Sequence, residues 1–250
     1  MTKGNIVEYI EQQKIIAAAV LEENKGRLKL ITENNREVSF SSKRLSHFSQ
    51  VCLDVNLARD AMVNQLKALA LKRKTLSEAI DIRQLWELLH EESGEIDLPT
   101  MTLFCFDPPL TADHEAAVIR AFFNDRLYFK FNQSLFSPFS PDQVESKKHQ
   151  LRRMEAEETL VRQGSDWINQ VLSEKNTVQA IPQVVDILKD AFLFGNDSSH
   201  KVMARRIIKR SQLNSPDQLF PVFVKAGIFS RDENIDLLSM QIPTVFSRTV

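Results

Sequence analysis

The sequence predicts an α+β protein with several domains, because its apolar residues change pattern along the 250-residue chain. Short alternating runs between tight turns come first and are typical of β-strands. Repeats every three or four residues follow and predict helices, interrupted by a second pair of strands. The rest of the chain is again helical in pattern. We therefore expect domains over residues 1–50, 51–140 and 141–250.

The composition is that of an ordinary soluble protein. The chain is 43% hydrophobic and 26% charged, with a formal net charge of −1, so any contact with nucleic acid must come from a local basic patch. Cys52 and Cys105 have no CxxC spacing, which favours a reducing compartment. We find neither the apolar run of a signal peptide nor a membrane-spanning stretch, and expect a cytoplasmic protein with no membrane partner.

The first fifty residues predict four or five short strands. KIIAAAVLE (14–22) and RLKLIT (27–32) flank an Asn-Lys-Gly turn, and REVSF (36–40) follows an Asn-Asn turn. Within 27–32, two leucines alternate with Arg27 and Lys29, which should point away from the core. Strands this short and this closely spaced predict a small SH3-like β-barrel.

Residues 51–140 predict a linker helix followed by a winged helix-turn-helix. The linker helix should run from Asp54 to the basic triplet Lys72-Arg73-Lys74, and Ser77 should cap the next helix. Further helices should start at Asp97 and near Thr111. Three short helices and a hairpin are the plan of this fold.

The expected wing is RLYFKFN (126–132), a turn at Asn132-Gln133-Ser134 and a return strand from Leu135. Because side chains alternate along a strand, Leu127, Phe129 and Phe131 should be buried together. Arg126, Tyr128 and Lys130 should share the other face. Tyr128 is then the one aromatic left for stacking on a ligand.

The last hundred residues predict helices over 141–172, 181–194 and 201–210, with two shorter ones after them. Three segments have the form of a capping box, in which a Ser and a Gln or Glu three residues later bond to each other's backbone. They are Ser140–Gln143, Ser215–Gln218 and Ser230–Glu233.

No catalytic motif is present. The six glycines are too scattered for a phosphate-binding loop, the five histidines do not cluster, and no acidic cluster of the kind that holds magnesium occurs. We expect no catalytic residue, no metal site and no small-molecule cofactor in this chain.

Three groups of residues are candidates for binding an anionic polymer. The groups are Arg27, Lys29, Arg36, Lys43 and Arg44 in the barrel; Arg126, Tyr128 and Lys130 on the wing; and Arg205, Arg206, Lys209 and Arg210 in one helix. For the barrel group, an ordinary solvated face is the more common explanation. In the helix group, like-charged residues four apart cost stability unless an anion faces them, so a binding site and a solvated face explain it equally well.

Several stretches together resemble a known family. They are VEYIEQQK through RLSHF (7–48), IRQLWELL (82–89), the wing, DAFLFGNDS (190–198), the helix expected after Ser215, and KAGIFSRDENIDLLSMQIPTVFS (225–247). They are similar to the N-terminal region of ribonuclease II/R-like exoribonucleases (RNB family), in the branch where an SH3-like barrel and a winged helix replace tandem cold-shock domains. Residues 141–250 would then lead into the catalytic domain.

The resemblance implies a parent enzyme that hydrolyses single-stranded RNA from 3′ to 5′ with magnesium. The acidic cluster that binds that magnesium lies in the family's catalytic domain and has no counterpart in these residues. No residue here inherits a catalytic role. The resemblance implies that this region binds single-stranded RNA, and the three groups above are the candidate contacts.

Two other functions remain open. A winged-helix DNA regulator would place helix 112–124 in a major groove, where Asp113 and Glu115 would meet phosphates badly. A scaffold that binds protein partners is compatible with the near-zero net charge.

Overall fold

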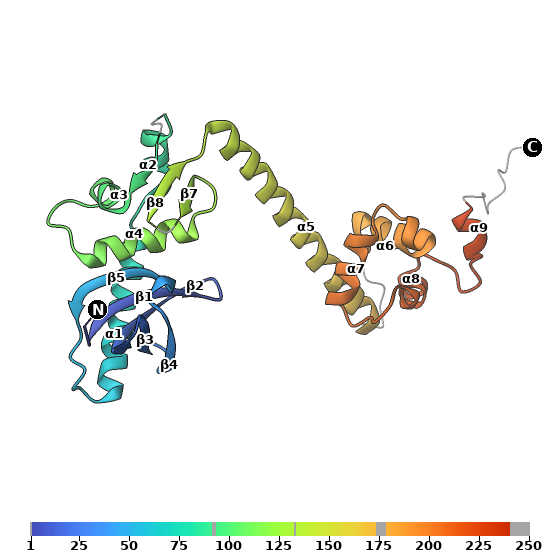
Figure 1. Cartoon of the computed structure of the whole chain (residues 1–250). Helices are drawn as coiled ribbons and strands as arrows, with labels where there is room; N and C mark the ends of the chain where they lie inside the picture. The colour runs from blue at the N-terminus through green and yellow to red at the C-terminus, as the bar shows by residue number, and fades with distance from the viewer. Residues whose placement is uncertain (1, 92–93, 133, 174–178, 241–250) are drawn as a thin grey trace, which may run out of the picture. The chain divides into compact units, whose positions relative to one another are not determined.

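The computed structural model divides the chain into two compact units, Met1–Lys148 and His149–Val250, called unit 1 and unit 2 below (Figure 1). It describes residues 2–91, 94–132, 134–173 and 179–240. Unit 1 combines two antiparallel sheets with helices and unit 2 is helical, which confirms the predicted α+β class.

A five-stranded antiparallel sheet opens unit 1, in the order β4-β3-β2-β1-β5. Its strands are β1 (Asn5–Glu11), β2 (Lys14–Asn24), β3 (Arg27–Thr32), β4 (Glu37–Ser41) and β5 (Leu45–Cys52). The predicted strands are confirmed, and β5 completes the set. β4 and β5 form the two edges of this sheet, and its closure into an SH3-like barrel remains a prediction.

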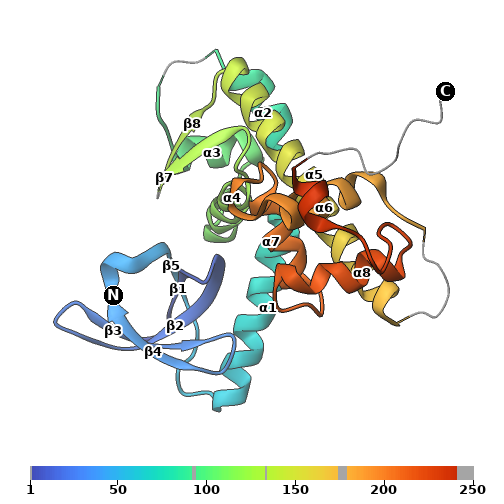
Figure 2. The same ribbon diagram turned by 90° about the vertical axis from the view of Figure 1, so that its right-hand side faces the viewer.

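Both faces of this sheet bury apolar side chains. One face gathers β-strand residues such as Val20, Leu28 and Leu30 into a cluster of their own. On the other face, Ile31 packs with Leu66 of helix α1 (Arg59–Glu78), and Figures 1 and 2 both show α1 alongside the sheet. Strand alternation therefore places Arg27 and Lys29 on the side opposite Leu28 and Leu30.

The end of α1 differs from the prediction. The helix continues through Lys72-Arg73-Lys74 to Glu78, because Arg73 is fully buried and paired rather than exposed at a helix end. Ser77 lies inside this helix and donates to the carbonyl of Lys74. The next helix, α2 (Ile82–Leu89), is capped instead by Asp81, whose carboxylate accepts from the backbone of Gln84 at 3.0 Å.

The remaining elements of unit 1 form the predicted winged helix-turn-helix. Asp97 caps one helix, and a Thr111–His114 capping box opens the other. Phe122, Phe129 and Phe136 meet edge to face in the core. Gln133 of the expected turn lies outside the described residues. The elements are β6 (Ile96–Asp97), α3 (Leu98–Cys105), α4 (Ala112–Asn124), β7 (Phe129–Asn132) and β8 (Leu135–Pro138), with strand order β6-β8-β7.

Unit 2 is built from helices around one apolar core that includes Trp167, Ile207 and Phe223. Its first helix, α5, begins in unit 1. The helices are α5 (Pro141–Ser173), α6 (Pro182–Phe194), α7 (Lys201–Arg210), α8 (Leu219–Lys225) and α9 (Ile235–Ser239). Among the described residues, none of the helices of either unit combines the length and apolarity that a bilayer crossing requires.

Two of the three predicted capping boxes are formed. Ser140 and Gln143 exchange hydrogen bonds at the start of α5, and Ser215 with Gln218 forms the second box. In the third segment Glu233 accepts from Ser230, but α9 is capped by Asn234. Residues 241–247, the end of the stretch that carries the resemblance, lie outside the described residues.

Candidate nucleic-acid interface

The register of the N-terminal sheet gathers polar side chains from three strands on one face. Residues directly opposite each other in an antiparallel pair share a face. Glu22 of β2 faces Lys29 of β3, and Asn24 faces Arg27. Lys29 is in turn opposite Ser39 of β4. The strands that bury leucines on one side therefore display charged and amide groups on the other.

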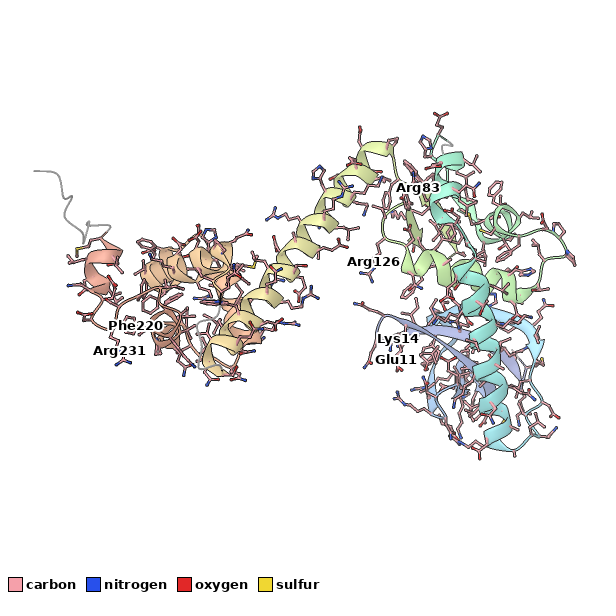
Figure 3. The ribbon with its side chains drawn as sticks, turned by 180° about the vertical axis from the view of Figure 1, so that it is seen from behind. Glu11, Lys14, Arg83, Arg126, Phe220 and Arg231 are labelled. Atoms are coloured by element: carbon pink, nitrogen blue, oxygen red, sulfur yellow. The ribbon has the colours of Figure 1, made fainter. Side chains whose placement is uncertain are left out.

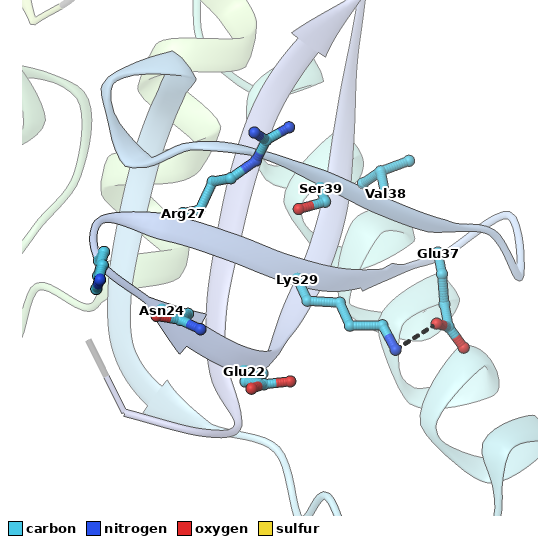
Figure 4. A pocket seen from close by; sticks show the side chains of 8 residues that line it. Glu22, Asn24, Arg27, Lys29, Glu37, Val38 and Ser39 are labelled. Carbon is cyan, nitrogen blue, oxygen red and sulfur yellow. Dashed lines mark ion pairs between the residues drawn. The ribbon is translucent and has the colours of Figure 1, made fainter.

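These side chains line an open groove of about 560 Å³ (Figure 4). Arg27 and Lys25 form no ion pair or hydrogen bond with any side chain that the structure describes. Lys29 is turned toward Glu37 and pairs with it at 3.0 Å. The groove therefore offers two free cations and a third that is shared with a carboxylate. Its lining is Glu22, Asn24, Lys25, Arg27, Lys29, Glu37, Val38 and Ser39.

The other predicted cations of the sheet do not line this groove. Arg36 lies 3.6 Å from the carboxylate of Glu11. The guanidinium of Arg44 lies over the ring of Phe40, 5.0 Å from its centroid. Lys43 is exposed in a short 3₁₀ turn. Of the five basic residues predicted here, the structure brings Arg27 and Lys29 together.

On the wing, Arg126 and Lys130 are exposed, whereas Tyr128 is half-buried. The Tyr128 ring lies 5.4 Å from the ring of Trp86, and the ammonium of Lys148 lies 6.0 Å from it on the same unit. Tyr128 is therefore largely used in packing. Figure 3 shows Arg126 projecting from the segment that precedes β7.

The strand alternation expected for residues 126–131 is only partly realised, because β7 begins at Phe129. The carboxylate of Asp125 accepts from the backbone N–H groups of Leu127 at 3.1 Å and of Tyr128 at 3.0 Å, so these residues form a turn at the end of α4. A side-chain acceptor that offers the backbone an alternative to a sheet ladder explains the difference.

The basic residues of α7 have anionic partners within unit 2. Arg206 pairs with Glu157 at 3.2 Å and with Glu158 at 3.0 Å, both on α5. Arg210 also pairs with Glu158, at 3.4 Å. Arg205 donates to the side chain of Asn196, and Lys209 is exposed. The anion that the like-charged pairs required is thus supplied largely by the chain itself.

A buried ionic network, which the sequence analysis did not predict, joins the sheet of unit 1 to its helices. Glu8 of β1 and Arg73 of α1 are both fully buried, and they pair at 2.7 Å. Arg120 of α4 reaches the same carboxylate oxygen at 2.8 Å. The charge of Glu8 at the centre of a buried strand was the available signal, because buried carboxylates require partners.

Asp113 and Glu115 of α4 belong to this network. Burial opposes ionisation of Asp113, but hydrogen bonds from Lys72 and Arg73 outweigh it and lower the pKa of its carboxyl group. Glu115 meets buried His47 of β5 at 3.3 Å. Burial lowers the pKa of His47. The acidic first turn of α4 is therefore occupied by contacts inside unit 1.

The match to a family model concerns mainly unit 2. Residues 144–235 match the family model described as the double HTH domain of ribonuclease II. That range includes nearly all of α5, the helices α6 to α8 and the start of α9. The sequence predicted these helices, but not their pairing into helix-turn-helix motifs.

The chain also resembles an uncharacterized ribonuclease from the cyanobacterium Synechocystis sp. (strain PCC 6803), with 27% identity over 168 residues. This match covers 66% of the chain and 25% of the relative, so the chain spans about a quarter of that relative's length. Among solved structures, the Dss1 exoribonuclease of Candida glabrata aligns with 98% of this chain and 38% of its own, with 10% identity and a TM-score of 0.44.

Proposed function

We propose that this chain, whose residues 144–235 match the double HTH domain of ribonuclease II, binds single-stranded RNA as the N-terminal region of a 3′-to-5′ exoribonuclease. The observation that carries the proposal is the groove on the N-terminal sheet. There Arg27 at the start of β3 and Lys25 in the turn between β2 and β3 are cations without a partner among the described side chains.

Unpaired cations on a rigid sheet suit the phosphates of a nucleic acid. Phosphate contacts from Arg and Lys supply most of the sequence-independent affinity for nucleic acids. The guanidinium of Arg27 presents a planar fork that matches a phosphate. Arg126 and Lys130 add exposed charge on the wing. Tyr128 is half-buried and packs against Trp86, so its ring is less available for stacking on a base.

The proposal assigns binding, and not hydrolysis, to these residues. Within the described ranges, no three His, Cys, Asp or Glu side chains are placed to hold a metal ion together. Magnesium-dependent hydrolysis is expected of the catalytic domain that the family resemblance implies. A cytoplasmic location is part of the same proposal.

Duplex DNA is the less favoured ligand. A winged helix that reads DNA inserts its recognition helix into the major groove. On α4, Asp113 and Glu115 are held by Lys72, Arg73 and His47. If the first turn of α4 faced DNA, these contacts would be broken and the two carboxylates would repel the phosphates.

The test is fluorescence anisotropy of a 5′-labelled oligoribonucleotide, titrated with the chain in magnesium and followed over time. We expect a stable rise that decreases with added salt. Arg27→Glu should weaken binding roughly tenfold, because charged hydrogen bonds are worth about 1.5–3 kcal/mol. The matched control is Lys67→Glu, at an exposed position of α1 outside the groove.

Equal binding by Arg27→Glu and Lys67→Glu would remove the groove from the proposal. A rise followed by decay would show that the chain itself cleaves RNA. The absence of any rise at low salt would overturn the proposal as a whole.

A further inference from the structure

The groove contains two carboxylates, and one of them, Glu22, is not paired with any cation of the groove. Glu37 is matched, because Lys29 and Arg59 both pair with it. Glu22 has no ion pair or hydrogen bond with any side chain in the described part of the chain. Figure 4 shows Lys29 turned toward Glu37 rather than toward Glu22, its direct neighbour across the strands.

The position of Glu22 follows from an irregularity in β2. The register between β2 and β3 shifts between Val20 and Glu22, so that Leu21 is an extra residue in the strand. Such bulges re-aim the side chains that follow them. Here the bulge places Glu22 and Asn24 on the same face as Arg27 and Lys29.

A free carboxylate beside a phosphate site repels the ligand unless it accepts a hydrogen bond from it. An ionised carboxylate can only accept, so its partner must be a donor. Phosphates have no donor at neutral pH. The ribose 2′-hydroxyl is a donor on the backbone of every ribonucleotide, and deoxyribose lacks it.

We propose that Glu22 accepts a hydrogen bond from the ribose 2′-hydroxyl of a nucleotide whose phosphate is bound by Arg27, and that the groove thereby selects RNA over DNA. This inference rests on the proposed function, and it makes Glu22 a specificity-determining residue. The groove volume of about 560 Å³ lies in the range of small-ligand sites, which suits one nucleotide of a single strand.

The spacing of the strands fits this assignment. Directly opposed residues of an antiparallel pair have Cβ atoms about 4.5–5.5 Å apart, and diagonal neighbours lie about 7–8 Å apart. Glu22 and Arg27 are diagonal neighbours, since Glu22 faces Lys29 and Asn24 faces Arg27. The sugar and the phosphate of one nucleotide can therefore contact both side chains at once.

The experiment compares three labelled oligomers of the same length and base: ribo-uridine, deoxyuridine and 2′-O-methyluridine. The 2′-O-methyl oligomer keeps an oxygen at the 2′ position but loses the donor. Anisotropy titrations at low salt use the full chain and its Glu22→Ala, Glu22→Gln and Glu95→Ala variants. Glu95→Ala removes one negative charge at another exposed position of unit 1.

We expect the unaltered chain to bind the ribo oligomer roughly tenfold more tightly than the other two, which is the effect of one hydrogen bond to a charged group. Glu22→Ala should abolish this preference, because it weakens the ribo complex and removes the repulsion that the deoxy and 2′-O-methyl oligomers meet. Glu22→Gln, whose amide oxygen still accepts, should retain part of it. Glu95→Ala should leave all three affinities unchanged.

Two outcomes would overturn the inference and leave RNA binding intact. One is equal affinity of the unaltered chain for the ribo and deoxy oligomers. The other is an equal gain in affinity for all three oligomers in Glu22→Ala, which would show that Glu22 only repels phosphate. If no oligomer binds, the proposed function fails, and the inference fails with it.

Discussion

At the scale of single residues, unit 1 depends on charges that water does not reach. Arg73 and Glu8 are fully buried and pair with each other. Without this pair, Glu8 would keep only Arg120 and Arg73 would keep only Asp113. Buried pairs of this kind contribute little net stability over an apolar replacement, but removing one partner is costly. The network joins α1 and α4 to the sheet, because Arg73 and Arg120 both pair with Glu8 of β1.

Replacing Arg73 with Met should lower the free energy of unfolding of unit 1 by about 3–5 kcal/mol, because fully buried Glu8 and mostly buried Asp113 each lose one of their two cationic partners. Urea unfolding measures this, with Trp86 as the reporter in a Trp167→Phe background. Trp167, buried in unit 2, reports on that unit in a Trp86→Phe background. The control Arg83→Met removes an exposed arginine and should change stability by less than about 0.5 kcal/mol. Similar shifts for both arginines would contradict the role of the network.

The pH dependence of unit 1 should follow His47. Burial lowers its pKa from 6.5 despite the nearby carboxylates of Glu8 and Glu115, so the unfolded chain takes up this proton at a higher pH than the folded unit. Stability is then present above pH 6.5 and decreases as the pH falls from there through the lowered pKa of His47. Asp113, whose pKa is also lowered, adds a further loss only below its usual value of 3.8.

His47→Gln should flatten the pH dependence of unfolding of unit 1 between about pH 7 and 5, because glutamine does not titrate. The measurement is urea unfolding at several pH values with Trp86 as the reporter, and the Trp167 transition of unit 2 serves as the internal control. Parallel pH curves for the variant and the unaltered chain would rule out His47 as the source.

At the scale of elements, unit 2 depends on a close approach between α5 and α7. A Cβ added at Gly164 would lie 2.9 Å from the Cγ2 atom of Ile207 and 3.0 Å from its Cδ1 atom. Alanine favours a helix interior over glycine by about 1 kcal/mol, whereas overpacking a core costs about 1–3 kcal/mol. The second effect should prevail, because the γ carbon of a β-branched side chain has little freedom to move.

Gly164→Ala should therefore destabilise unit 2 by about 1 kcal/mol in the unaltered chain. In an Ile207→Ala background the same change should stabilise it, since the clashing atoms are gone and the helix propensity remains. Unfolding reported by Trp167 completes this double-mutant cycle. The same sign in both backgrounds would show that contact with Ile207 does not decide the effect.

Element types could largely be predicted from sequence, and element ends less well. The alternating leucines of β3 and the capping residues Asp97 and Ser140 identified their elements correctly, because those signals are local. The end of α1 was misplaced because Arg73 resembles an exposed C-terminal cation, and only its partners at sequence distances of 40 and 65 residues show that it is buried. The ionic network was not predicted for the same reason, because its partners are far apart in the sequence.

The candidate groove also combines residues that the sequence predicted with one that it did not. Alternation along β3 was enough to place Arg27 and Lys29 on the polar face. Glu22 was missed because its orientation depends on the bulge in β2, which a pattern of apolar residues does not reveal. Tyr128 was overestimated as a stacking surface because Trp86, distant in sequence, packs against it.

At the scale of the whole molecule, the net charge of −1 limits how RNA can be held. If binding uses mainly Lys25, Arg27 and Lys29, the logarithm of the binding constant should fall with the logarithm of salt concentration with a slope of about −2, at about 0.7 per phosphate contact on a single strand. Titrations between low and moderate salt measure this slope. A slope several times steeper would show that basic residues beyond the groove, including those of α7, take part.

The ionic network also has a consequence for how unit 1 folds. The carboxylate of Glu8 meets partners 65 and 112 residues further along the chain. Contacts between such distant segments form only after the intervening loops have closed, so they belong to the late stages of folding. Removing them should accelerate unfolding far more than it slows refolding. The buried charges of Glu8, Arg73 and Arg120 thus determine how long unit 1 stays folded once it has formed.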